Sequence, residues 1–237
     1  MEVARALLHD YEQRLMVFMQ LHRHAKRLFA AWLFTLYGGW VVAWGVFRAV
    51  NPVDPTLWWV GAKLAVWVAP VAVLMRLLPL PFEALESRHT RRVGWAGAIS
   101  LAWVGLNALG DTLLHRTPAA AFNASVLSAC LVSPLLEELL FRGFAFAWLE
   151  RSGLGYWKTN LASALLFALL HLPGWVATQG LHLSLGAQLA QTAALGFFFG
   201  LVRWKHGSLW APVLVHMANN AWSQGLIRWL WQACFSR

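Results

Sequence analysis

The sequence predicts an all-α fold, a polytopic membrane helix bundle of about seven to eight transmembrane segments. Hydrophobic residues fill 59% of the 237 positions and charged residues only 12%, whereas soluble domains hold about half and a quarter. Sixteen tryptophans suit many helix ends at lipid–water boundaries, where indole rings are favoured. A soluble fold of this length would have to bury the apolar excess in one core, so we exclude that class.

The first 27 residues are predicted to form an amphipathic helix on the cytoplasmic face of the membrane. Apolar residues recur at helical spacing from Leu7 to Leu21, and basic residues lie among and after them. Such a helix lies in the membrane interface. No small-residue cleavage site follows a short apolar core, so we do not expect a cleavable signal peptide.

Seven apolar runs follow, and a span needs about 20 such residues. The fifth run is short and is expected to end at Pro173 and Gly174, and the fourth would become two spans if it divided at Pro134. We expect one transmembrane domain over 28–237, with its functional core at about 119–232. The predicted spans are 28–50, 57–80, 93–110, 119–149, 161–172, 183–202 and 210–231.

Basic residues are concentrated in alternate loops between these spans. If the spans simply alternate, all of these loops lie on one side, and the positive-inside rule places them and the N-terminus in the cytoplasm. Seven spans then place the C-terminus outside. The formal charge of +9 forms no single basic patch, so we expect no nucleic-acid partner. The residues concerned are Arg23, Lys26, Arg27, Arg88, Arg91, Arg92, Arg151, Lys158, Arg203 and Lys205.

Three polar sets interrupt the apolar runs, and ionisable residues in spans mark functional sites by default. The first set follows Pro134 and contains Glu137, Glu138 and Arg142. Glu138 and Arg142 are four residues apart and can pair on a helix. Glu137 is rotated by about 100° from Glu138, so we expect it to point at a different neighbour. Taken alone, this set also fits ordinary charges at a cytoplasmic helix end.

The other two sets are histidines with a partner one helical turn away. His171 shares a face with Phe167, and His216 shares one with Asn220. Taken alone, each set fits a structural role, since His and Asn commonly form hydrogen bonds between membrane helices. Together, a carboxylate, two imidazoles and an amide on three helices can converge in one cavity of a bundle.

This order and spacing resemble the CPBP family of membrane proteases, the CAAX proteases and bacteriocin-processing enzymes, also called the Abi family. The family signature is EExxxR, then FxxxH, then HxxxN, and the resemblance extends from Ser133 to Asn220. Phe141 and Gly143 also match the context of the first motif. The stretch 207–212 resembles the family's lead-in to the last motif. The matching residues are Glu137, Glu138, Arg142, Phe167, His171, His216 and Asn220.

The resemblance implies a metal-independent endopeptidase in which Glu137 and His171 activate a water for attack on a peptide carbonyl. It further implies that His216 and Asn220 donate hydrogen bonds to the developing oxyanion, the kind of contact that usually contributes most to catalysis. Glu138 and Arg142 would support the site by their ion pair, although the family leaves the division of roles between the two glutamates open. No cofactor is implied.

Two alternatives stay open. Glu137, His171 and His216 are also a possible ligand set for Zn²⁺, which often takes two histidines and one carboxylate in catalytic sites, although the His-x-x-x-His helix of zinc proteases is absent. A non-catalytic binding or immunity protein would use the same cluster to hold a hydrophobic peptide or a prenyl chain. Intact motifs favour the enzyme.

The expected partners are the lipid bilayer and a membrane-attached protein or peptide substrate, cleaved near one membrane boundary. We expect an integral, multi-pass protein of a bacterial plasma membrane, an expectation that rests on chain size and style. Cys130 and Cys234 make no disulfide framework or metal spacing. We expect both to be inert packing residues.

Overall fold

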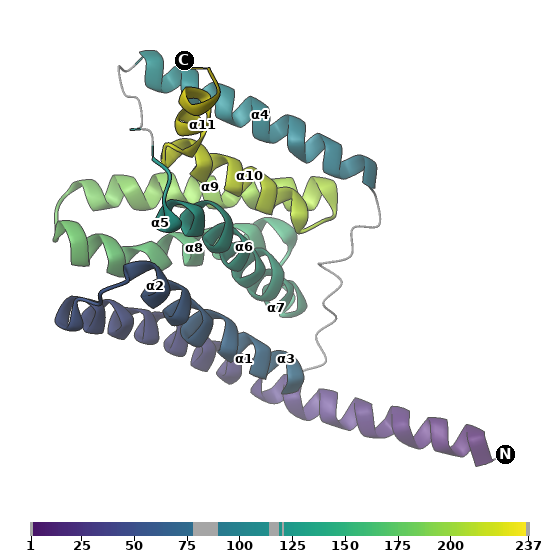
Figure 1. Ribbon diagram of the computed structural model, residues 1–237. Coiled ribbons are helices and arrows are strands. Elements are labelled where there is room, and N and C mark those ends of the chain that lie inside the picture. Colours follow the sequence, from purple (N-terminus) through teal and green to yellow (C-terminus); the bar gives the residue numbers. More distant parts are fainter. Residues whose placement is uncertain (1, 78–89, 114–118, 120, 236–237) are drawn as a thin grey trace.

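A computed structural model describes residues 2–77, 90–113, 119 and 121–235 of the chain (Figure 1). This part is built of helices and contains no β-strand, which confirms the predicted class. Labels beginning with η mark π-helical segments. The elements are α1 (Glu2–Val50), α2 (Pro55–Lys63), η1 (Leu64–Val68), α3 (Ala69–Leu77), α4 (Thr90–Leu113), α5 (Ala124–Leu127), η3 (Ser128–Val132), α6 (Ser133–Glu138), η4 (Leu139–Ala145), α7 (Phe146–Arg151), α8 (Tyr156–Gln179), α9 (Ser184–His206), α10 (Trp210–Ser223) and α11 (Leu226–Phe235).

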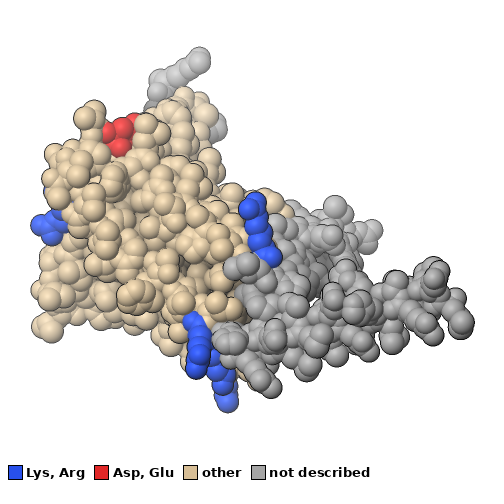
Figure 2. All heavy atoms as spheres, turned by 90° about the horizontal axis from the view of Figure 1, so that it is seen from below, with Lys and Arg blue, Asp and Glu red and all other residues tan. Residues whose placement is uncertain are grey.

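Within the described residues, 5 helical segments are long and apolar enough to cross a membrane. Large apolar side chains are exposed on the outer surface of the bundle: Phe34, in the first of these segments, is 81% exposed, and Leu101, on the separate helix α4, is 76% exposed. Figure 2 shows one face of the molecule on which few charged residues interrupt the described surface. A surface of this kind suits lipid, so the protein is an integral membrane protein. The five segments are Lys26–Val50, Pro55–Arg76, Ala124–Arg151, Tyr156–Gln179 and Ser184–His206.

The predicted N-terminal segment and the first predicted span form one continuous helix. α1 is one helix from Glu2 to Val50, and its first part projects beyond the bundle in Figure 1. The physical reason is local, because residues 2–37 contain no glycine or proline that would end a helix. Asn51, with a φ of 45°, follows the helix and begins the turn toward α2.

The fourth run does not divide at Pro134, so the version of the prediction with an additional span there is wrong for this segment. Asn123 begins the run as an N-cap, its side chain accepting a hydrogen bond from the Val126 N–H at 2.9 Å. From Ala124 to Arg151 the helix is continuous, alternating between α-helical and π-helical segments. Pro134 is the second residue of α6, separated by one residue from the end of the π-helical segment η3, and a π-helical turn is one of the ways in which a helix absorbs the hydrogen bond that proline removes.

The fifth run is longer than predicted, because α8 continues through Pro173 to Gln179. Membrane helices tolerate an internal proline when neighbouring groups compensate for the lost hydrogen bond. Here the following turn packs on α1: a Cβ added at Gly174 would lie 2.8 Å from Cζ2 of Trp44. The helix therefore gains a tertiary contact where the sequence pattern indicated an end.

The last run is two helices and not one span as predicted. α10 ends at Ser223, and Gly225 has a φ of 75° before α11 begins. A side chain at Gly225 would collide with the Ala119 carbonyl oxygen, 1.8 Å from an added Cβ. At 1.5 Å per residue, the 14 residues of α10 cover about 21 Å, short of the roughly 30 Å hydrocarbon core.

The bundle places α8 beside α9 and packs α10 against both α4 and α9 (Figure 1). α1 joins the same core: Trp32 is only 2% exposed, and its ring centre lies 4.9 Å from that of Phe144. The ring of Phe29 stacks on Trp148 at 5.5 Å. The N-terminal helix therefore shares one hydrophobic core with the second half of the chain.

The end of α7, the start of α8 and the end of α9 lie close together in the described structure. Glu150 at the end of α7, Tyr156 at the start of α8 and Arg203 near the end of α9 line one hollow of about 260 Å³. Arg88 lies outside the described residues, as does most of the loop predicted between the second and third spans. The loop predicted from residue 111 begins later, since α4 continues to Leu113.

Candidate active site

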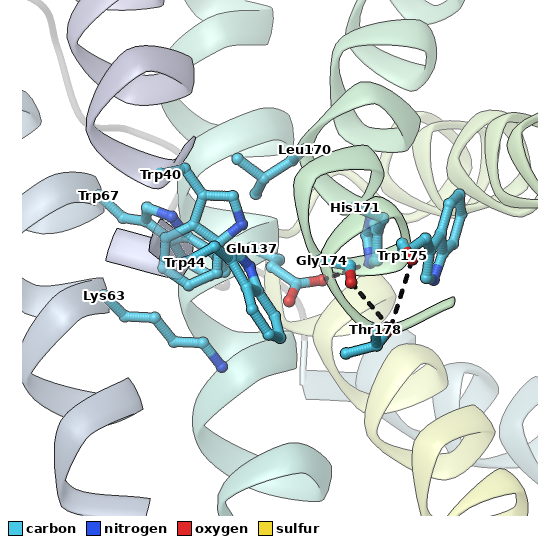
Figure 3. Close-up of a pocket in the computed structure, with 10 residues that line it drawn as sticks. All are labelled: Trp40, Trp44, Lys63, Trp67, Glu137, Leu170, His171, Gly174, Trp175 and Thr178. Atoms are coloured by element: carbon cyan, nitrogen blue, oxygen red, sulfur yellow. Dashed lines mark hydrogen bonds and ion pairs between the residues drawn. The ribbon is translucent and has the colours of Figure 1, made fainter. Parts of the chain in front are cut away.

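The two adjacent glutamates are presented by α6, at its C-terminal end, and both are buried. Glu137 is 6% exposed and Glu138 is 0% exposed. Because successive helical residues point about 100° apart, the two carboxylates reach different surroundings. Glu138 points into the closed core of the bundle, whereas Glu137 lines a cavity (Figure 3).

Glu138 forms the ion pair with Arg142 that its spacing predicted. Arg142 Nη1 donates to Glu138 Oε1 at 3.1 Å, and neither side chain reaches the surface. Arg142 Nη2 also donates to the carbonyl oxygen of Gly196 at 2.6 Å. The guanidinium lies 4.4 Å from the ring centre of Phe167. The buried cation is thus held by a carboxylate, a carbonyl and an aromatic face on three segments of the chain.

His216, on α10, lies between the two glutamates. Its Nδ1 donates to Glu138 Oε1 at 2.9 Å, since an ionised carboxylate can only accept. Its Nε2 lies 3.8 Å from Glu137 Oε2. Glu137 was expected to point at a different neighbour from Glu138. Both carboxylates instead face the His216 imidazole, and Glu137 faces His171 in addition. Phe199 stacks on that ring at 4.6 Å and orients it.

His171, on α8, approaches Glu137 from the other side. Its Nδ1 donates to the Phe167 carbonyl oxygen at 3.0 Å, so in the neutral ring Nε2 carries the lone pair. That Nε2 lies 4.0 Å from Glu137 Oε2, too far for a direct hydrogen bond. A single water molecule is the usual bridge across a polar separation of this size.

Asn220 lies one helical turn after His216 on α10, and its side chain is hydrogen-bonded to neighbouring parts of the protein. Its Nδ2 donates to the Ala129 carbonyl oxygen at 2.9 Å. Its Oδ1 accepts from Asn219 Nδ2 at 3.1 Å, and Asn219 Oδ1 accepts from Trp103 Nε1 on α4 at 2.9 Å. Trp103 and Asn219 were not foreseen from the sequence. No signal pointed to Trp103, whereas Asn219 stands beside a predicted residue.

The cavity beside Glu137 has a volume of about 220 Å³ and is walled largely by indole rings (Figure 3). Two of the predicted site residues, Glu137 and His171, line this cavity. Lys63, from α2, was missed, although an ionisable residue within the predicted second span is a signal that could have found it. The lining residues are Trp40, Trp44, Lys63, Trp67, Glu137, Leu170, His171, Gly174, Trp175 and Thr178.

Within the described part of the chain, no group of three or more His, Cys, Asp and Glu side chains is placed to hold a metal ion. Glu137 does face both histidines, at 3.8 and 4.0 Å. Atoms that each lie about 2.0–2.2 Å from one Zn²⁺ are roughly 3–4 Å from one another, so these two separations do not distinguish a zinc ligand set from a metal-free site. Cys130 is buried and Cys234 is exposed, and both are free thiols.

Residues 119–222 match the family described as type II CAAX prenyl endopeptidase Rce1-like. The match covers the helices that carry all six predicted site residues, and it confirms the resemblance to CAAX-type membrane proteases. The chain is also 29% identical, over 168 residues, to an uncharacterised 24.3 kDa protein of Escherichia coli. That alignment covers 64% of this chain and 66% of the relative, just under two thirds of its length. No solved structure matches the chain.

Proposed function

Because residues 119–222 match the Rce1-like endopeptidase family, we propose that this membrane protein is a glutamate-dependent, metal-independent endopeptidase. Its substrate is a membrane-attached protein or peptide, which it hydrolyses within or at the edge of the bilayer. The observation that carries the proposal is the 4.0 Å separation between Glu137 Oε2 and His171 Nε2, at a cavity that both residues line.

The catalytic water lies between these two atoms. An ionised Glu137 and a neutral His171 with its proton on Nδ1 both present acceptors, so one water donates one hydrogen to each. Its lone pairs then point away from both acceptors, toward a substrate carbonyl in the cavity. Glu137 is the general base, since a carboxylate enclosed by apolar walls is suited to accept a proton.

The reaction proceeds in two balanced steps. Glu137 takes one proton from the water while the oxygen forms a bond to the carbonyl carbon, and the carbonyl oxygen becomes an oxyanion. The proton then passes from Glu137 to the peptide nitrogen as the C–N bond breaks. An acid and an amine are released, and the carboxylate is restored for the next turnover.

Glu138 and Arg142 are positioning residues in this mechanism. Glu138 Oε1 accepts from both Arg142 and His216, at 3.1 and 2.9 Å, and the fully buried side chain does not line the cavity. The pair instead holds α6 and the His216 ring in place. Preorganisation of this kind is needed because small displacements of catalytic groups are costly.

His216 and Asn220 are the proposed oxyanion donors. Their existing hydrogen bonds limit which of their N–H groups can donate to the oxyanion. His216 Nδ1 already donates to Glu138, so its Nε2 can donate to the oxyanion only when the ring is protonated. Asn220 has one amide hydrogen committed to Ala129 and a second that remains for the substrate. Each donor of this type contributes about 10²–10³-fold to the rate.

Membrane orientation belongs to the same proposal. The N-terminus is cytoplasmic, in a bacterial plasma membrane, with residues 28–237 as one transmembrane domain and the protease core at about 119–232. The shared side of the α7, α8 and α9 ends, which hold Arg151, Lys158 and Arg203, supports this. Labelling of single cysteines placed at Lys158 and Leu181 from outside intact cells tests it, with modification expected at Leu181 alone.

The test of the function is cleavage of a panel of membrane-attached peptides by the protein in native membranes. Wild type is compared with Glu137→Gln and His171→Ala, each with and without a strong chelator, and with Glu150→Gln as a matched control outside the site. Loss of cleavage in the two site variants, with no effect of chelator on wild type, is the expected result.

Two other outcomes would overturn the proposal. Activity that is abolished by the chelator and restored by Zn²⁺ would make Glu137 and His171 metal ligands. Binding of the peptides by wild type and both variants alike, without cleavage by any of them, would make the protein a non-catalytic membrane binding or immunity protein.

A further inference from the structure

Lys63 supplies a positive charge to the proposed active-site cavity from outside the family match. It ends α2, within the apolar segment Pro55–Arg76, and it lines the cavity together with Glu137 and His171 (Figure 3). Charged side chains within membrane segments are costly and almost always face a partner or a functional cavity. Lys63 is expected to serve the cavity if its contacts within the protein leave some of its hydrogen-bond donors unused.

The partners of Lys63 in the described structure are a hydroxyl and an aromatic ring. Its ammonium donates a hydrogen bond to Ser133 Oγ and lies 5.2 Å from the ring centre of Trp67. No carboxylate of the described residues lies within ion-pair distance, although Glu137 attracts it through space. An ammonium has three donors, so part of its hydrogen-bonding capacity faces the cavity.

The cavity separates this cation from the proposed catalytic groups. Lys63 comes from α2 and Glu137 from α6, and the Trp44 and Trp67 rings lie beside them in Figure 3. A peptide whose scissile carbonyl reaches the water at Glu137 therefore passes indole surface on its way to the ammonium. Such a cavity suits a substrate that carries apolar groups and one anionic group close to the bond that is cut.

We propose that Lys63 is a specificity-determining residue that binds a carboxylate of the substrate near the scissile bond. The inference rests on the proposed endopeptidase function. Two sources supply this chemistry in a peptide: the α-carboxylate of a free C-terminus, or the side chain of an Asp or Glu. Because a hydrogen bond between charged groups is stronger than a neutral one, the enzyme distinguishes a carboxylate from its amide.

The experiment compares the cleavage of matched peptides by the enzyme in detergent micelles. One peptide ends in a free carboxylate, a second ends in an amide, and a third and fourth carry Asp or Asn next to the cleavage site. Wild type is compared with Lys63→Gln and Lys63→Arg, and with Arg76→Gln, an exposed cation farther along the same segment, as a control. KM and kcat are measured separately.

Wild type should cleave at least one carboxylate peptide with a KM about tenfold or more below that of its amide partner. Lys63→Gln should remove this difference, whereas Lys63→Arg and Arg76→Gln should keep it. A preference for the free C-terminus identifies the α-carboxylate as the source, and a preference for Asp over Asn identifies a side chain.

Two results would overturn the inference. The first is a wild-type enzyme that treats every acid and amide pair alike. The second is a Lys63→Gln variant that slows all four peptides by one factor, which would limit Lys63 to a supporting contact with Ser133 and Glu137. Failure of the proposed function is distinguishable, because cleavage by Glu137→Gln would then persist on every peptide.

Discussion

Two neighbouring residues of one helix, Glu137 and Glu138, lie in opposite kinds of surroundings. Glu138 is fully buried, and one of its oxygens accepts short hydrogen bonds from Arg142 and His216. Glu137 borders a cavity, and its contacts with His171 and His216 are long, at 4.0 and 3.8 Å. The first environment is closed, although Glu138 Oε2 has no hydrogen-bond partner among the described residues, whereas the second is open to a cavity.

This difference in surroundings favours different roles for the two glutamates of one motif. An ion pair in the closed core holds the geometry of the site and is not accessible to a ligand in the cavity. A carboxylate with long contacts leaves room for a water molecule and retains its ability to accept a proton. Variants on the Glu137 side are therefore expected to affect turnover first, and variants on the Glu138 side to affect stability first.

The largest expected effect is that of Glu137→Gln. An amide keeps the size of the side chain but is a far weaker base, so kcat should fall about 10²–10⁴-fold. Thermal unfolding in detergent should change little, because Glu137 makes no short ion pair with the described residues. Peptide cleavage and unfolding are measured on the same preparation. A variant that retained wild-type kcat would contradict the assignment of Glu137 as the base.

Glu138→Gln should act mainly on stability. It leaves Arg142 buried with an incomplete partner, and breaking a buried ion pair costs about 3–5 kcal/mol. The double variant Glu138→Leu with Arg142→Met removes both charges and should recover much of that loss. Reversible unfolding in mixed micelles measures each of the variants. Equal losses in the single and double variants would show that the ion pair is not the source of the effect.

Gly196→Ala should disturb the same closed region through packing. An added Cβ would lie 2.8 Å from Arg142 Nη2 and 2.9 Å from Phe167 Cδ1, so overpacking of about 1–3 kcal/mol is expected. Gly186→Ala is the matched control on α9, because nothing lies within 4 Å of its added Cβ. That control should be neutral or slightly stabilising in unfolding measurements. A harmless Gly196→Ala would show that the Arg142 pocket has room to relax.

The smallest expected effect is that of a change at Trp103, which donates to Asn219, which in turn donates to Asn220. Trp103→Phe keeps an aromatic ring against Phe198, which now stacks at 4.9 Å, but removes the N–H that Asn219 accepts. A loss of about 1 kcal/mol and a few-fold fall in kcat with unchanged KM are expected. Trp95→Phe, at an exposed position on α4, is the control. An unchanged kcat would uncouple Asn219 from the orientation of Asn220.

Local spacing accounts for the features that the sequence predicted well. Glu138 and Arg142 meet because a helix brings residues four apart onto one face, and Asn220 follows His216 by the same interval. The three motifs were expected to converge, and the structure places Nε2 of His171 and Nε2 of His216 at 4.0 and 3.8 Å from Glu137 Oε2. Where local rules conflicted with packing, the predictions were wrong. Pro173 did not end α8, and the run after Trp210 broke at Gly225.

The sequence by itself determined that this chain is a helical membrane protein, and it singled out the three polar motifs, because composition and periodicity are properties of neighbours along the chain. Tertiary structure decided which nitrogen of His216 faces which glutamate, and that α8 continues past Pro173 onto Trp44. It also decided that Lys63 enters the cavity beside Glu137. These contacts join helices far apart in sequence, and their geometry depends on how the bundle packs.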